Sequence, residues 1–129
     1  MPTGKECAAP WTASIAMQAA ASELGFDWPS ADGVLDKIAE ETGEIREALD
    51  AGDLEQARRE LGDLLLAAVN LSRFLGIGPS DALSGANERF TRRFARVKAE
   101  ADLAGMDLRS CSLAELDVLW ERAKRHGSQ

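Results

Sequence analysis

The sequence has 129 residues, of which 45% are hydrophobic and 29% are charged, as is ordinary for one soluble globular domain. Its 22 acidic and 15 basic residues give a formal net charge of −7 and form no basic stripe, so we expect no binding to nucleic acid through phosphate neutralisation. There is no apolar run of about 18 residues and no signal-peptide pattern, and we therefore expect a cytoplasmic protein without a membrane partner.

The residue pattern is helical along the whole chain. No window alternates apolar and polar residues, tyrosine is absent, and Ala, Leu, Glu and Arg are abundant, which favours helices over strands. The sequence predicts an all-α, antiparallel helical bundle with four main helices and a short C-terminal helix. In chain order, the first predicted helix runs from about Trp11 to Leu24, and the second starts after Ser30 or Asp32 and ends near Leu49. The others run from Leu54 to Leu75, from about Asp81 to Ala104 and from Leu113 to about Arg125.

Glycines and capping residues mark the predicted helix ends. Asp53 with Gln56 forms a capping box before the third predicted helix, and Ser112 with Glu115 forms another before the fifth. A glycine follows the first, third and fourth predicted helices, as is common at helix ends: Gly25, Gly76 and Gly105.

The connections between the predicted helices are short, which favours antiparallel neighbours in one bundle. The turn 25–30 carries two aromatic residues, Phe26 and Trp28, which could pack against the bundle or line a pocket. We expect a single domain over residues 1–129, with flexible ends at 1–10 and 127–129.

Four glutamates lie in the second predicted helix and point in two directions. On a helix that advances about 100° per residue, one apolar stripe contains four residues: Val34, Ile38, Ile45 and Leu49. Glu41 lies on the edge of this stripe, with Glu44 and Lys37 beside it. Glu40 and Glu47 point well away, so two of the four glutamates flank the core and two face solvent.

The third predicted helix is apolar nearly all round, which predicts a central position in the bundle. Two acidic residues interrupt it, Glu60 and Asp63. They are three residues apart and therefore share a face, which Ala67 and Asn70 continue. Because a buried carboxylate without a partner is strongly disfavoured, this face needs compensating charge.

Cysteine and histidine offer little chemistry in this sequence. Cys7 and Cys111 lie near opposite ends, without the short spacing of a zinc or redox motif, and we interpret them as packing or surface thiols. His126 is the only histidine and lies in a polar C-terminal tail. Acid–base or metal chemistry must therefore fall to carboxylates.

Four carboxylates are expected to meet where the second and third helices pack as antiparallel neighbours: Glu41 and Glu44 on one, Glu60 and Asp63 on the other. Two like unit charges about 4 Å apart repel by roughly 4 kcal/mol at an effective dielectric constant near 20, so cations or protons must offset them. Oxygen ligands without His or Cys favour Mg²⁺ or Mn²⁺. Glycines inside both helices predict a close approach between them: Gly43 and Gly62.

The alternative interpretation is a set of ordinary surface ion pairs. By spacing alone, carboxylates three residues apart are common on exposed helices. The possible pairs are Glu44 with Lys37, Glu60 with Arg58 or Arg59, and Glu47 with Arg46.

The acidic motif resembles a known family signature. Glu40-Glu41-x-x-Glu44, then 15 residues, then Glu60-x-x-Asp63 is similar to the EExxE…ExxD signature of the MazG-type, all-α nucleoside triphosphate pyrophosphohydrolases. The likeness covers about Ser14 to Arg125 and looks like the C-terminal, catalytic half of MazG. Further matching segments are 25–28, 36–37, 62–65, 69–71, 86–94 and 119–124.

The resemblance implies a hydrolase of the EC 3.6.1 class that cleaves nucleoside triphosphates to the monophosphate and pyrophosphate. It implies dependence on Mg²⁺, with Mn²⁺ as a possible substitute, and assembly into a homodimer or homotetramer. Water would attack the α-phosphorus, which requires charge neutralisation, a polarised water and a held leaving group.

The resemblance also implies roles for individual residues. The implied metal ligands are Glu41, Glu44, Glu60 and Asp63. The implied catalytic residues are Glu40, Glu41 and Glu44, of which Glu40 could orient the water or recruit another ion. The implied phosphate contacts are Lys37, Arg89 and Arg93, and the substrate contacts of the C-terminal helix are Trp120 and Lys124. Gln56 stands where some members have a basic residue, for which Arg58 or Arg59 could substitute.

Three positions in the last part of the chain have a packing interpretation beside the functional one. Trp120 could stack on the base or close the short C-terminal helix onto the bundle. Phe90, Phe94 and Val97 follow helical spacing, for which core packing is the prediction. Arg89 stands where the family often has lysine, which keeps the charge and changes the geometry.

Three rival interpretations keep part of this pattern. The segment 39–43 mimics the end of a Nudix box, but the upstream glycine, the Arg-Glu pair and the strands of that fold are missing. A non-catalytic helical module that binds a partner or a nucleotide would keep the fold and discard the chemistry. A ferritin-like di-iron bundle would need Glu-x-x-His pairs, which His126 cannot supply.

Overall fold

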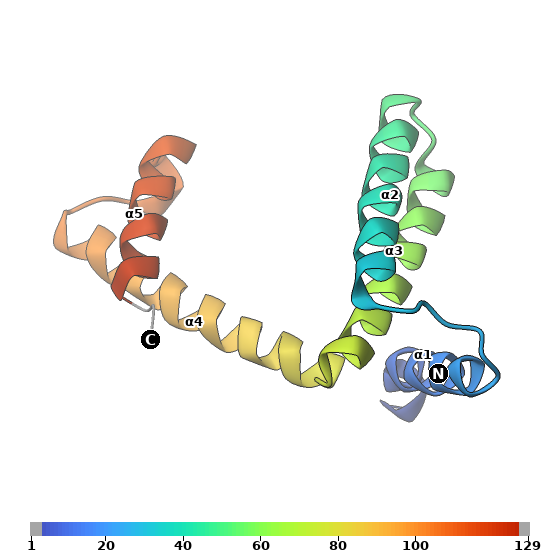
Figure 1. Cartoon of the computed structure of the whole chain (residues 1–129). Helices are drawn as coiled ribbons and strands as arrows, with labels where there is room; N and C mark the ends of the chain where they lie inside the picture. The colour runs from blue at the N-terminus through green and yellow to red at the C-terminus, as the bar shows by residue number, and fades with distance from the viewer. Residues whose placement is uncertain (1–3, 127–129) are drawn as a thin grey trace. The chain divides into compact units, whose positions relative to one another are not determined.

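The computed structural model describes residues 4–126, and the side chains from residue 10 onward. Over these residues the chain is helical, with no strand among them, which confirms the all-α prediction (Figure 1). The elements in chain order are α1 Gly4–Glu23, α2 Ala31–Asp50, α3 Leu54–Leu75, α4 Pro79–Leu103, a 3₁₀ helix η1 Leu108–Ser110, and α5 Leu113–His126.

The helix boundaries agree with the sequence prediction except at α1. That helix begins at Gly4 and continues through Pro10, whereas the sequence predicted a start at Trp11. Pro10 lies inside this helix, where it removes one backbone hydrogen bond but does not end the helix. Of the ends predicted to be flexible, residues 1–3 and 127–129 lie outside the described part of the chain.

The two predicted helix caps form, one of them only in part. Ser112 Oγ accepts from the backbone N–H of Glu115 at 3.1 Å, and Glu115 Oε1 accepts from the N–H of Ser112 at 2.9 Å, which completes that capping box. Asp53 Oδ1 accepts from the N–H of Gln56 at 3.0 Å. The side chain of Gln56 does not close the second box, because it donates to Glu60 instead.

The chain divides into two compact units, one up to Asp81 and the other from Ala82 onward. In the first unit, α2 and α3 lie side by side as an antiparallel pair and α1 packs against α3 (Figure 1). Among the described helices, none has by itself the length and apolar composition needed to cross a membrane, although α3 and α4 taken together meet those two criteria.

The contact face of α2 is centred on an acidic residue. The buried positions of α2 are Val34, Glu41 and Ala48, which repeat every seven residues. A seven-residue repeat keeps one seam of a helix against its neighbour. Glu41 is thus in the middle of the seam, and its predicted place on the edge of the apolar stripe was wrong, as was the predicted burial of Leu49, which is 55% exposed.

The predicted all-round burial of α3 was wrong within the described chain. The face of α3 that carries the buried Glu60 also contains the small residue Ala67, seven positions later, and this face packs against α2. Three leucines outside the seam are 42–49% exposed: Leu61, Leu65 and Leu66. The predicted close approach at Gly43 and Gly62 was also wrong, because a Cβ atom at either position would meet nothing within 4 Å.

The second unit is a hairpin of α4 and α5 with its own small core. Its buried residues are Val97, Ala101, Leu119 and Ala123, with Met106, Leu108 and Trp120 packed against them. Phe90 and Phe94 were predicted to be core residues, but they are 58% and 42% exposed. The Phe90 ring packs on the Trp120 ring, with centroids 5.5 Å apart.

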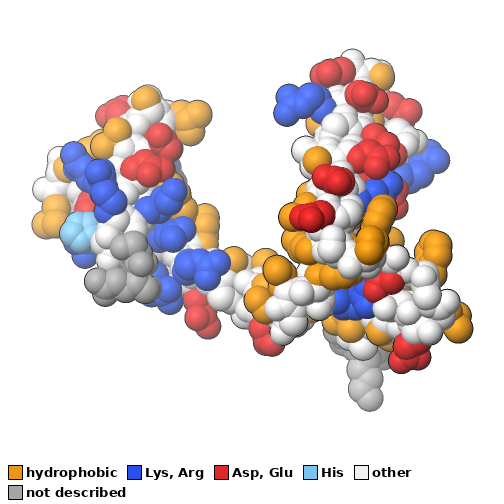
Figure 2. Space-filling view, viewed as in Figure 1, with side chains coloured by type: hydrophobic (Ala, Val, Ile, Leu, Met, Phe, Trp, Pro, Cys, Tyr) orange, Lys and Arg blue, Asp and Glu red, His pale blue; other side chains and the backbone are white. Residues whose placement is uncertain are grey.

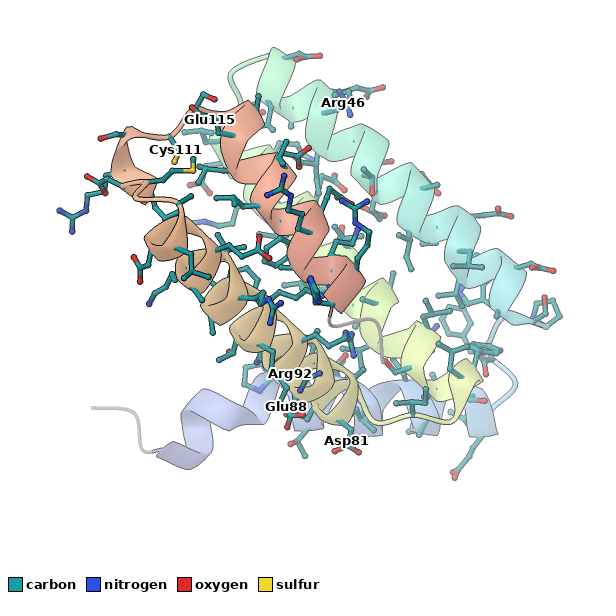
Figure 3. The ribbon with its side chains drawn as sticks, turned by 90° about the vertical axis from the view of Figure 1, so that its left-hand side faces the viewer. Arg46, Asp81, Glu88, Arg92, Cys111 and Glu115 are labelled. Carbon is teal, nitrogen blue, oxygen red and sulfur yellow. The ribbon has the colours of Figure 1, made fainter. Side chains whose placement is uncertain are left out.

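Cys111 lies just before α5, close to Glu115 (Figure 3). The thiol is partly buried and donates to the carbonyl oxygen of Asp107 at 3.3 Å. Burial raises the pKa of the Cys111 thiol, and the nearby carboxylates of Glu115 and Asp107 raise it further. A thiol held in its protonated form is a poor nucleophile, so the structure agrees with a packing role. The side chain of Cys7 lies outside the described part.

Ala101→Leu is expected to destabilise the protein by about 1–3 kcal/mol, because the side chain is 1% exposed in the seam between α4 and α5 and a larger one overpacks it. Ala99→Leu is the matched control, since Ala99 is exposed on the same helix. Urea unfolding followed by circular dichroism measures both. Equal stability of the two variants would show that α4 and α5 do not pack through Ala101.

Candidate functional site

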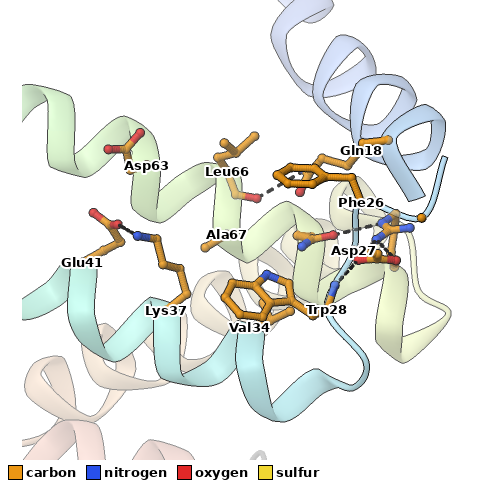
Figure 4. A pocket seen from close by; sticks show the side chains of 14 residues that line it. Gln18, Phe26, Asp27, Trp28, Val34, Lys37, Glu41, Asp63, Leu66 and Ala67 are labelled. Carbon is orange, nitrogen blue, oxygen red and sulfur yellow. Dashed lines mark hydrogen bonds and ion pairs between the residues drawn. The ribbon is translucent and has the colours of Figure 1, made fainter. Parts of the chain in front are cut away.

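The structure brings four acidic residues together from two neighbouring helices. Glu41 and Glu44 project from α2, and Glu60 and Asp63 project from α3. Carboxylate oxygens of Glu41, Glu60 and Asp63 lie within 4.8 Å of one another, as do oxygens of Glu40, Glu41 and Glu44. Two groups that could hold a metal ion therefore share Glu41, and Figure 4 shows Glu41 and Asp63 on facing helices.

Two of these carboxylates are buried and incompletely paired. Glu41 is 2% exposed and Glu60 is 7% exposed. Lys37 Nζ lies 2.8 Å from Glu41 Oε1, and Gln56 Nε2 donates to Glu60 Oε1 at 2.5 Å. The second oxygen of each carboxylate has no hydrogen-bond partner among the described residues. Such orphaned oxygens are costly inside a protein unless a proton or a cation binds them.

The close carboxylates shift each other's titration in opposite directions. The neighbouring Glu41 carboxylate raises the pKa of Glu60 to about 7, helped by the nearby Glu44 and by burial and opposed by the Gln56 amide. The nearby Glu60 and the Lys37 ammonium lower the pKa of Glu41. In the absence of metal, Glu60 therefore binds a proton more readily than an ordinary glutamate does.

We expect the stability of the metal-free protein to fall as pH rises from about 4.5 to about 7. The pKa of Glu60 in the folded state is raised to about 7, so the folded state holds a proton that the unfolded state has released. The stabilisation from this group is complete below its ordinary pKa and is lost as pH rises through the folded pKa. Thermal unfolding in chelator, followed across this pH range, measures it.

Glu60→Gln should flatten that pH dependence, whereas Glu47→Gln, at an exposed position on α2, should retain it. The same slope in Glu60→Gln would exclude Glu60 as the titrating group. Three other carboxyl groups have a shifted pKa, and in each it is lowered, so they affect stability at more acid pH: Asp27, Glu41 and Glu115.

The acidic cluster fits a hard divalent cation. Its donors are carboxylate oxygens from facing helices, with no sulfur or imidazole ligand, a set that suits Mg²⁺ or Mn²⁺. The two orphaned oxygens, on Glu41 and Glu60, provide free lone pairs for such an ion. Glu40 is more peripheral, since its side chain is 56% exposed and lies 3.6 Å from Lys37 Nζ.

A cavity of about 610 Å³ lies within the first unit and reaches the carboxylates of Glu41 and Asp63. Lys37, Glu41 and Asp63 line one end, and the aromatic turn with Phe26 and Trp28 lines another part (Figure 4). The pocket interpretation of these aromatic residues is therefore confirmed.

The second unit carries a separate basic hollow. Four arginines, Ala123 and His126 surround a volume of about 180 Å³. The arginines are Arg89, Arg92, Arg93 and Arg96. The Arg93 guanidinium lies 6.0 Å from the centre of the Trp120 ring, and its buried Nε has no hydrogen-bond partner among the described residues. Figure 2 shows Lys and Arg side chains gathered on the α4–α5 unit and acidic side chains along α2.

Two of the predicted substrate residues are exposed near the ends of helices. Arg59 lies exposed in the second turn of α3. Lys124 lies in the last turn of α5, with its Nζ 3.6 Å from Glu121.

Sequence reasoning missed the roles of four residues at the acidic cluster and the two cavities. Gln56 donates to Glu60, whereas the sequence indicated a cap and a position that is basic in some family members. Arg73 binds Asp27 across 46 residues of sequence, a contact that no local pattern announces. Arg92 and Arg96 share a face of α4 with the predicted Arg89 and Arg93, and their helical spacing is the signal that could have found them.

Comparisons with known proteins agree with this acidic site. Residues 29–97, which include all four clustered carboxylates, match the MazG nucleotide pyrophosphohydrolase domain. The chain is 43% identical over 108 residues to the nucleoside triphosphate pyrophosphohydrolase/pyrophosphatase MazG of Thermotoga maritima, covering 84% of this chain and 41% of that protein. It is 36% identical over 111 residues to the nucleoside triphosphate pyrophosphohydrolase of Escherichia coli K12, covering 84% of this chain and 42% of that protein. The chain thus spans about two fifths of the length of these curated relatives.

Proposed function

The chain belongs to the MazG nucleotide pyrophosphohydrolase family, and from this premise we propose that it hydrolyses nucleoside triphosphates to the monophosphate and pyrophosphate. The observation that carries the proposal is the cluster of Glu41, Glu60 and Asp63, whose oxygens lie within 4.8 Å of one another at the end of a cavity. An ordinary surface ion pair would not bury two carboxylates with an unpartnered oxygen on each.

The proposed cofactor is Mg²⁺, with Mn²⁺ as a substitute, held by Glu41, Glu44, Glu60 and Asp63. When bound, the metal supplies positive charge against the substrate phosphates and lowers the pKa of a coordinated water. Gln56 fixes one oxygen of Glu60 and leaves the other free to bind.

The remaining roles belong to residues around the acidic cluster. Lys37, beside Glu41, provides a positive charge for the α-phosphate region. Glu40, at the exposed edge, is placed to orient the attacking water. Arg59 is proposed as a further phosphate contact in the place of the basic residue that some family members have near Gln56.

The arginines of α4 are proposed to hold the leaving pyrophosphate. Arg89 and Arg93 are one helical turn apart and line the same basic hollow, and guanidinium groups bind phosphate oxygens through paired hydrogen bonds. Trp120 supports Arg93 from α5, and Lys124 on that helix is proposed as another substrate contact.

Assembly and location follow the same proposal. We propose that residues 1–129 form a single domain that assembles into a homodimer or homotetramer. The exposed leucines of α3 support this assembly, because apolar surfaces of this kind commonly mark protein interfaces. A cytoplasmic location fits a free nucleotide substrate. A net charge of −7 does not favour a nucleic-acid partner.

The test is to incubate the purified chain with each triphosphate and Mg²⁺ and identify the products by chromatography. Monophosphate and pyrophosphate in equal amounts are expected, and chelator should abolish both. Release of orthophosphate, or no turnover even with Mn²⁺, would contradict the proposal and favour a non-catalytic helical module.

A further inference from the structure

The cavity beside the carboxylates is much larger than a metal site requires. Its volume is about 610 Å³, whereas each water of a hydrated cation takes about 30 Å³. Cavities of roughly 300–1,000 Å³ typically hold organic ligands of drug size. The part of the cavity away from Glu41 and Asp63 therefore has room for an organic group.

One wall of this part is a tryptophan held in place by a glycine. The Trp28 ring lies against the first turn of α2, where a Cβ atom built on Gly33 would come within 2.5 Å of Trp28 Cε3. Only glycine leaves this space for the ring. Val34 and Ala67 continue the apolar lining beside Trp28 (Figure 4), so the cavity offers an aromatic wall of the kind on which nucleobases stack.

A buried amide lines the same cavity from α3. Asn70 is 9% exposed and lies seven residues after Asp63. Seven residues are nearly two full turns, so the two side chains share a face roughly 10 Å apart along the helix. This is the order of distance that separates a 5′-phosphate from the far edge of its base in a nucleotide.

The orientation of this amide is set by a network that reaches back to the aromatic turn. Arg73 Nε donates to Asn70 Oδ1 at 3.0 Å, and Arg73 Nη2 donates to the two carboxylate oxygens of Asp27 at 2.8 and 2.9 Å. Because Oδ1 is taken by Arg73, the NH₂ group of Asn70 is directed elsewhere. Within the described residues, it makes no hydrogen bond.

Asp27 itself is fully engaged and is not a ligand for substrate. Its Oδ2 accepts from Ser22 Oγ at 2.7 Å and its Oδ1 accepts from the N–H of Trp28 at 2.8 Å, in addition to the two bonds from Arg73. The same carboxylate thus fixes both Arg73 and the backbone of Trp28. One network positions the aromatic wall and the amide donor together.

We propose that the base of the nucleotide substrate binds in this cavity against Trp28, and that the Asn70 NH₂ group donates to an acceptor atom on the base. Arg73 and Asp27 are positioning residues that act through Asn70 and Trp28. The inference rests on the proposed function, because it assigns a binding place in the first unit to the base of that substrate. Trp120 on α5 then contacts Arg93 and not the base.

The test measures binding of AMP, GMP, CMP and UMP, each with Mg²⁺, to the full chain by isothermal titration calorimetry. Asn70→Ala should weaken the best-bound monophosphate about tenfold, as expected for one lost hydrogen bond in a buried site. It should leave the affinity for Mg²⁺ alone and for ribose 5-phosphate unchanged. Asn87→Ala, at an exposed position on α4, is the matched control.

Two further variants keep the test decisive if Asn70→Ala does not fold. Gly33→Ala should displace Trp28 and weaken the monophosphate similarly. Arg73→Met should weaken it about threefold or more and should raise KM with little change in kcat, as expected of a residue that positions a binding group. Arg46→Met, at an exposed position on α2, should change neither.

Unchanged monophosphate affinity in the folded variants would overturn the inference. Equal weakening of ribose 5-phosphate would place the Asn70 contact on the sugar and overturn the assignment to the base. If monophosphate binding depends on Asn70 but the wild type releases no pyrophosphate, the proposed hydrolysis is contradicted and the base-binding site is supported. If the wild type releases pyrophosphate and none of the three variants changes that rate, the hydrolysis is supported and the base-binding site is contradicted.

Discussion

Replacing Glu41 by glutamine is expected to lower nucleoside triphosphate hydrolysis by about a hundredfold or more, an order of magnitude that follows from losing a metal ligand at the centre of the site. Glu41 belongs to both groups of carboxylates that could hold a metal ion. Glutamine keeps the size of the side chain and removes its charge, so the packing of α2 on α3 is preserved. Asp63→Asn, which removes the charge from the facing helix, should have the same effect.

Initial rates at saturating Mg²⁺ measure this loss, and titration with Mn²⁺ measures metal affinity independently. Glu47→Gln is the matched control, because Glu47 is exposed on the same helix, and its rate should be nearly that of the wild type. Full activity in Glu41→Gln would show that the buried carboxylates are structural. A large loss in Glu47→Gln would mean that the metal is bound on the outer face of α2.

Arg93→Ala is expected to reduce kcat/KM by about a hundredfold or more, because two hydrogen bonds to charged phosphate oxygens contribute about 1.5–3 kcal/mol each. The Arg93 guanidinium lies over the Trp120 ring in the basic hollow, and its Nε has no partner within the described residues. Arg93→Lys should restore only part of the activity, since lysine lacks the planar fork that binds two phosphate oxygens.

Steady-state kinetics with a triphosphate and with the corresponding monophosphate as inhibitor separate this effect from a general one. Arg93→Ala should weaken the triphosphate strongly and the monophosphate little, because the lost contacts are to the leaving pyrophosphate. Arg122→Ala, at an exposed position on α5, should change neither. Equal weakening of both nucleotides would contradict a role for Arg93 at the leaving group.

The helices were predictable from residue composition and capping residues. The carboxylate cluster was predictable because helical spacing puts two acidic residues on one face of each of two neighbouring helices. Helical spacing put Glu60 and Asp63 on one face with Asn70, and the structure brings Glu41 and Glu44 opposite to them. What spacing could not fix was the phase of α2 against α3. The seam follows the seven-residue repeat through Glu41, since small side chains such as Ala48 allow the closest approach, and the larger apolar Leu49 is left outside it.

Contacts between distant parts of the chain were not predictable from local sequence. The network of Asp27, Arg73 and Asn70 joins the aromatic turn to α3, and each residue alone looks like an ordinary polar residue. Gln56 looked like a helix cap, and only the packing of α2 on α3 reveals that its amide serves Glu60. The leucines of α3 were predicted to be buried and are exposed, because an apolar pattern does not show which other surface would cover these side chains.

The most direct test of the proposed hydrolysis is the position of oxygen transferred from water. Turnover of a nucleoside triphosphate in ¹⁸O-labelled water with Mg²⁺, followed by mass spectrometry of the products, shows which phosphorus is attacked. Attack at the α-phosphorus predicts one ¹⁸O atom in the nucleoside monophosphate and none in the pyrophosphate. Label in the pyrophosphate, or in released orthophosphate, would contradict the account.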